Sequence, residues 1–174
     1  MTGGLKHTID KATDMIGGTA GKMSAGTISS ADGFVNNAAI GNLYEIEAAT
    51  IGMQRANAEP VKAFARKMLL DHTTAKHQMS AALEMKETNG VSTPPQSLDT
   101  RHEAMLKHLS DSPEDDFDTT YLNQQVLAHE ETVSLMRNYA DNGDNPQLRS
   151  LALGTLPVVE RHLHEAKMIK QAAT

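Results

Sequence analysis

The chain has 174 residues, a formal net charge of −6 and no cysteine. A negative net charge without a basic stripe disfavours a nucleic-acid backbone as a partner, so we expect no nucleic-acid binding. Without cysteine there is no disulfide, thiolate metal site or iron–sulfur cluster. Three Phe, three Tyr and no Trp leave the apolar content to Ala, Leu and Met, which favours helices over strands. We predict an all-α protein.

The sequence also bears on membranes. No segment approaches the ~20 consecutive apolar residues of a membrane-spanning helix, and we expect no membrane span. The N-terminus lacks the charged start and unbroken apolar run of a signal peptide. We therefore expect a cytoplasmic protein.

Residues 1–30 are rich in Gly, Thr and Ser and read as an N-terminal arm. One short amphipathic stripe lies within it, and we expect Gly17 and Gly18 to end it. The stripe consists of Leu5, Ile9, Ala12 and Ile16. A loosely packed arm is the favoured interpretation. Docking on the rest of the chain, a homo-oligomer contact through the arm and contact with a membrane surface are the alternatives.

Four long helices are predicted in residues 31–174. The first begins with Ser30 or Asp32 as its N-cap and runs to about Asn57. The second starts at Pro60 and ends before Asn89-Gly90.

The other two long helices follow a shorter one, whose apolar face carries Leu98, His102, Met105 and Leu109. Ser112-Pro113-Glu114 starts the third long helix, and Asn142-Gly143 ends it. Asn145-Pro146 opens the fourth. This pattern predicts a four-helix bundle, with the short helix between the second and third long helices.

Each long helix carries one polar residue near its middle: Glu45, His72, His129 and His162. They lie roughly 12 to 17 residues from the helix starts, and at ~1.5 Å per residue they should share one level of the bundle. The three histidines fall on apolar stripes. Burying several unpaired imidazoles is costly, and a divalent metal ion would relieve that cost.

We therefore predict a metal site formed by Glu45, His72, His129 and His162, holding zinc, iron or manganese. A hydrogen-bonded polar layer without metal is the competing interpretation. Glu45 is the least secure ligand, because Glu47 lies on a roughly opposite face and only one of the two can point inward. Asp71 and Glu130, next to two of the histidines, are interpreted as solvated carboxylates rather than partners of the ligands.

A di-iron bundle needs a Glu-x-x-His motif on each of two helices. The residues three positions before the histidines are Leu69, Val126 and Val159, all apolar. The usual two-iron site is thus missing from the sequence, and a single ion fits better.

Several segments resemble an uncharacterised bacterial family, the domain of unknown function 4142. The first is Glu45-Ile46-Glu47, and the second is Val61-Lys62-Ala63-Phe64-Ala65 leading to Asp71-His72. The others are Phe117-Asp118-Thr119-Thr120-Tyr121 leading to His129, then Leu156-Pro157 and His162-Leu163. The resemblance covers about residues 31–172.

This resemblance implies a ferritin-like fold, with the family pattern falling on Glu45, Asp71, His72, His129 and His162. Members of the family are often labelled outer-membrane or exported proteins, whereas this chain lacks a signal peptide. The resemblance supplies no activity. We expect a metal-binding bundle with one ion in its core, with a role in stress or redox protection, and leave open whether it is an enzyme. The alternative is a non-catalytic structural or interaction bundle.

Overall fold

A computed structural model describes residues 2–173, apart from the side chains of Thr2 and Leu5. The described chain is all-α, as predicted, and contains no strand. Its α-helices are α1 (Thr2–Ala25), α2 (Ala31–Arg55), α3 (Glu59–Leu83), α4 (Thr100–Asp111), α5 (Phe117–Asn142) and α6 (Pro146–Ala172). Two 3-10 helices lie in the connections, at Lys86–Thr88 and Glu114–Asp116.

The starts of the long helices follow from local capping. The Ser30 hydroxyl accepts a 3.2 Å hydrogen bond from the Gly33 amide at the start of α2. At α6 the Asn145 side chain accepts from two amides, and Pro146 occupies the first turn. Ala58 has no side chain to cap α3, so Asp118 of α5 accepts from the Asn57 and Ala58 amides at 2.9 and 2.8 Å.

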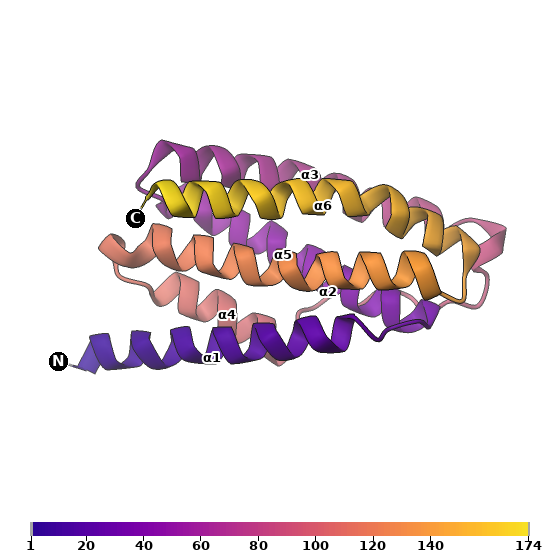
Figure 1. Ribbon diagram of the computed structural model, residues 1–174, viewed down its shortest axis with the longest axis horizontal. Coiled ribbons are helices and arrows are strands. Elements are labelled where there is room, and N and C mark those ends of the chain that lie inside the picture. The colour runs from indigo at the N-terminus through magenta and orange to yellow at the C-terminus, as the bar shows by residue number, and fades with distance from the viewer. Residues whose placement is uncertain (1, 174) are drawn as a thin grey trace.

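The long helices α2, α3, α5 and α6 form a bundle (Figure 1). α2 and α3 form an antiparallel hairpin, as do α5 and α6, whereas α3 and α5 run in the same direction. The segment that crosses between α3 and α5 contains α4. One long crossover of this kind is a feature of ferritin-like bundles. The bundle is therefore confirmed, and its ferritin-like classification stays a prediction.

The core consists of two apolar clusters, one toward each end of the bundle. One is built around Tyr44, Phe64, Met68 and Tyr121, and the other around Phe34, Met79, Met136 and Leu148. The predicted polar residues lie between them: along α3, His72 comes between Met68 and Met79. The polar layer thus divides the apolar interior at mid-height.

Helix α1 corrects the prediction for the N-terminal segment. It continues through Gly17 and Gly18 as one helix of 24 residues, so the predicted stop there was wrong. It lies along α5 and α4 (Figure 1). The expected apolar stripe faces solvent instead, since Ile9 is 56% exposed and Ile16 73%; Leu5 lies outside the described side chains.

Small and polar residues make the docked face of α1, where Asp14, Gly18 and Ala25 are buried. A Cβ atom at Gly18 would lie 3.0 Å from a methyl group of Leu127, so the missing side chain lets α1 approach α5 closely. The two glycines that read as a helix stop in the sequence are therefore part of the helix-packing surface.

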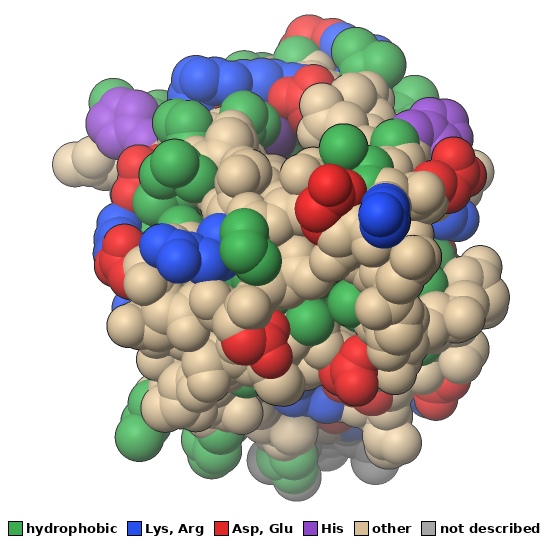
Figure 2. All heavy atoms as spheres, turned by 90° about the vertical axis from the view of Figure 1, so that its right-hand side faces the viewer, with side chains coloured by type: hydrophobic (Ala, Val, Ile, Leu, Met, Phe, Trp, Pro, Cys, Tyr) green, Lys and Arg blue, Asp and Glu red, His purple; other side chains and the backbone are tan. Residues whose placement is uncertain are grey.

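The outer surface carries both signs of charge. On the end of the bundle that Figure 2 shows, Lys and Arg side chains are interspersed with Asp and Glu. Among residues 2–173, no helix is both long enough and apolar enough to cross a bilayer.

Candidate metal centre

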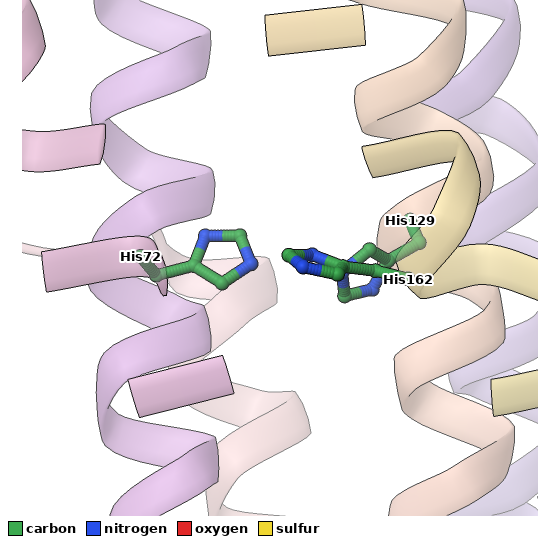
Figure 3. Close-up of side chains that lie close together, drawn as sticks. All are labelled: His72, His129 and His162. Carbon is green, nitrogen blue, oxygen red and sulfur yellow. The ribbon is translucent and has the colours of Figure 1, made fainter. Parts of the chain in front are cut away.

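Three imidazole rings from three helices meet in the middle of the bundle. His72 reaches inward from α3, His129 from α5 and His162 from α6 (Figure 3). Their ring centroids are 5.5 to 5.8 Å apart. One ring nitrogen from each residue lies within 4.8 Å of the other two. The structure therefore brings together the three histidines that the helix offsets placed at one level.

The three rings are almost completely shielded from solvent. His72 is 5% exposed, and His129 and His162 are each 1% exposed. Their neighbours along each helix stripe, such as Met68, Val133 and Val159, are buried apolar residues. The 3.6-residue helical period that buries these neighbours also turns the histidines inward.

Each imidazole uses one nitrogen to donate a hydrogen bond away from the cluster. His72 Nδ1 donates to Asn42 Oδ1 at 2.8 Å, and His129 Nδ1 donates to the Gln125 carbonyl at 2.9 Å. His162 Nε2 donates to Asp71 Oδ2 at 2.8 Å. Because all three partners are acceptors, the proton of each neutral ring is fixed on the outward-facing nitrogen.

The other three nitrogens are consequently lone-pair acceptors that face one another. They are His72 Nε2, His129 Nε2 and His162 Nδ1, and each is buried without a hydrogen-bond partner. Leaving a buried acceptor unsatisfied costs about 1–3 kcal/mol. Three such nitrogens that face one point form a donor set that could hold a metal ion.

Burial also keeps the rings neutral. Burial, reinforced by the nearby His162, lowers the pKa of His129 from 6.5 to about 3. Burial likewise lowers the pKa of His72 well below its ordinary value, with His129 and His162 adding to the effect. The pKa of His162 is lowered by burial, although its hydrogen bond to Asp71 opposes the shift. Neutral imidazole is the form that binds metal ions.

Glu45 lies beside this cluster rather than within it. Its Oε1 is 3.5 Å from His129 Nδ1, the nitrogen that faces away from the other two rings. The group of mutually close ligand atoms contains the three histidines without Glu45. Glu45 is buried, as its helix stripe predicts, and Glu47 is exposed. A ligand role for Glu45 stays a prediction.

Burial raises the pKa of the Glu45 carboxyl group from 4.5 to about 8, against the opposing effect of a hydrogen bond from Gln125. That bond joins Gln125 Nε2 to Glu45 Oε2 at 2.7 Å. Glu45 Oε1, Gln125 Oε1 and the Tyr121 hydroxyl are themselves buried without a partner. At pH 7 the protonated form is therefore favoured, and a cation beside the carboxyl group would favour its ionisation.

Sequence reasoning missed the residues that orient the rings. Asp71 was interpreted as a solvated carboxylate, yet it holds His162 across the α3–α6 interface. Asn42 was not singled out at all. The neighbouring carboxylate Glu130 does pair with lysines, namely Lys22 and Lys167, away from the rings. The signals for Asp71 in the sequence were its position directly before His72 and its place in the pattern of the resembled family.

A second buried polar cluster also went unpredicted. His108 of α4 is only 4% exposed. Its Nδ1 lies 2.5 Å from Asp14 Oδ2 of α1, and its Nε2 lies 3.1 Å from His7 Nδ1. Gln124 donates to the same Asp14 oxygen at 2.7 Å. These bonds tie α1 to α4 and α5, so His108 is buried only because α1 is docked.

Comparison with known proteins gives one result. The model of the family described as "Domain of unknown function (DUF4142)" matches residues 18–169. The match begins inside α1 and covers every helix of the bundle. No curated protein and no solved structure matches the chain.

Proposed function

The chain belongs to the DUF4142 family, and we propose that it is a metal-binding bundle protein that holds one divalent ion between His72, His129 and His162. The observation that carries this proposal is the convergence of three unpartnered, buried imidazole nitrogens. Each ring donates a hydrogen bond to an acceptor on the side away from the cluster. Hydrogen bonds of this kind fix the orientation of histidine ligands in metal sites. A metal-free polar layer would instead be expected to satisfy its own acceptors.

The chemistry of the donors favours particular ions. Three neutral nitrogen donors suit zinc or iron(II) better than manganese, which prefers oxygen. Three protein ligands also leave at least one coordination position open, as in catalytic rather than structural zinc sites. With iron(II) as the ion, an open position would support a role in redox or stress chemistry; zinc itself has no redox chemistry. Glu45, beside His129, would supply a carboxylate to balance the charge of the ion.

Titration of the untagged, metal-free protein with zinc and with iron(II) under argon tests the proposal. We expect one ion per chain for the wild type and loss of that binding in His129→Ala. His77→Ala is the matched control, because His77 is an exposed histidine on α3 that belongs to no cluster of ligand atoms in residues 2–173. Unchanged binding in His129→Ala, or none in the wild type, would leave the metal-free polar layer as the better account.

A second proposal, assembly through α1, rests on a separate observation. Four large apolar side chains of α1 are more than half exposed: Ile9, Met15, Ile16 and Met23. Exposed apolar faces of this kind often mark sites of contact between protein chains. Ile16→Glu should lower the molar mass in solution if α1 joins copies of the chain. The same mass for wild type and variant, measured by light scattering, would refute this role.

A further inference from the structure

A small cavity inside the bundle reaches the histidine cluster from one side. Residues of all four long helices line it, among them both His72 and His162. Its volume is about 40 Å³, whereas a single water molecule needs roughly 10–15 Å³ by the same kind of measure. The cavity therefore has room for a molecule of two or three heavy atoms beside two of the proposed ligands.

Small side chains create this space. Ala38 and Gly41 of α2 and Ala75 of α3 lie in its wall, where larger residues would fill it. Phe34, Met79 and Met136 form apolar parts of the wall farther along the bundle. An enclosure with mainly apolar walls admits neutral molecules more readily than ions.

The charge of the cavity wall also favours neutral molecules over anions. Asp71 is part of the lining, and its side chain is 32% exposed while it holds His162. The partly exposed lining residues come from all four long helices and include Asp71 and Ala75 of α3. A partly exposed carboxylate in the cavity wall disfavours the entry of anions.

We propose that this cavity is the access and binding pocket for a small neutral molecule that coordinates the metal ion at its open position. The substrate class is an uncharged molecule of two or three heavy atoms. Molecules of more than a few heavy atoms are excluded by the cavity volume, and anions are disfavoured by Asp71. This inference rests on the proposed metal site.

The experiment uses protein loaded with cobalt(II), whose visible absorption reports its coordination. Nitric oxide is the neutral diatomic probe, with azide as the anionic probe and imidazole as the bulky neutral one. We expect nitric oxide to shift the cobalt bands at concentrations at least tenfold below those needed for azide or imidazole. An equal or greater response to azide or imidazole would overturn the size and charge selection.

Two glycines provide matched variants. A Cβ at Gly41 would contact only the Thr132 hydroxyl, at 4.0 Å, so Gly41→Ala adds an atom to the cavity wall without a clash, and Gly41→Val adds two more. Gly154 of α6 is exposed with nothing within 4 Å, so Gly154→Val is the control. We expect Gly41→Val to weaken nitric oxide binding at least tenfold at unchanged cobalt stoichiometry, with a smaller loss in Gly41→Ala.

The outcomes separate this inference from the metal site itself. Cobalt bound at one per chain with no nitric oxide response, or with equal responses in Gly41→Val and Gly154→Val, overturns the cavity proposal and leaves the metal site standing. Failure of the wild type to bind cobalt overturns both.

Discussion

Asp71 Oδ2 accepts a 2.8 Å hydrogen bond from Nε2 of His162, and this bond leaves His162 Nδ1 as the nitrogen that faces the other two rings. The two residues come from α3 and α6, so the bond crosses a helix interface. His162 thereby differs from His72 and His129, which present Nε2 to the centre. The carboxylate fixes both the tautomer and the direction of the ring.

Removing this carboxylate should weaken metal binding without removing a ligand. In Asp71→Ala, the His162 ring loses its orienting partner, and we expect a metal dissociation constant about 10- to 100-fold higher. Competition with a chromophoric chelator measures it. Asp141→Ala, at an exposed position on α5, should retain wild-type affinity. Equal affinity in both variants would mean that Asp71 does not position a ligand.

Replacing one histidine by an apolar residue should have opposite effects in the absence and presence of metal. His72→Leu removes one of the unsatisfied buried nitrogens, and the Asn42 oxygen that it frees is in a half-buried side chain that water can reach. Removing an unsatisfied buried acceptor removes a cost of about 1–3 kcal/mol. The metal-free variant should therefore unfold at a higher urea concentration than the metal-free wild type.

Adding zinc should raise the unfolding midpoint of the wild type and leave that of His72→Leu unchanged, because binding to the native state alone stabilises it. A destabilised metal-free His72→Leu would indicate that His72 stabilises the apoprotein through contacts of its own.

The metal-free protein should lose stability as the pH falls below about 6.5. The native pKa values of all three histidines are lowered, that of His129 to about 3, so the unfolded chain binds protons in this range and the native state does not. Stability then falls with decreasing pH, by up to about 1.4 kcal/mol per pH unit for each histidine.

Glu45 has the opposite effect on how the stability of the fold depends on pH. Its native pKa of about 8 exceeds the unfolded value of 4.5, so its contribution is lost as the pH rises from 4.5 to 8. Below pH 6.5 the three histidines, together with His102, whose pKa burial also lowers, outweigh Glu45; among these groups only Glu45 acts above pH 6.5. Urea unfolding across pH 5–8 should show a maximum near pH 6.5. In Glu45→Gln the decline above pH 6.5 should disappear, and its persistence would contradict this assignment.

The docking of α1 should depend on Asp14. In Asp14→Ala, His108 and Gln124 each lose a buried hydrogen-bond partner, which costs about 1–3 kcal/mol per group. We expect faster amide hydrogen exchange throughout α1, with the metal site unaffected. Asp10→Ala is the control, since Asp10 pairs only locally with Lys6 among the described ion pairs. Equal exchange rates in the two variants would show that the Asp14 contacts do not hold α1.

The sequence was most informative where a structure depends on a single helix. Ser30 and Asn145 cap helices, and the three histidines lie inside because periodicity along each helix determines which face is buried. It was least informative where two helices must already be in contact. Gly18 reads as a helix stop because only the docked α5 gives it a packing role.

The burial of His108 and the hydrogen bond of Asp71 could not be predicted from the sequence, and the reason is the same for both. His108 is covered by α1, and Asp71 turns away from the stripe of its own helix to reach α6. Neither partner can be identified from periodicity within one element. The metal, the cytoplasmic location and the ligand role of Glu45 remain predictions.

Metal-edge X-ray absorption on protein reconstituted with one equivalent of zinc would identify the ligands of the ion directly. If His72, His129 and His162 bind it, we expect three nitrogen neighbours of imidazole type at about 2.0–2.1 Å, reduced to two or fewer in His162→Ala. A coordination shell made up mainly of carboxylate or water oxygens, unchanged in His162→Ala, would contradict it.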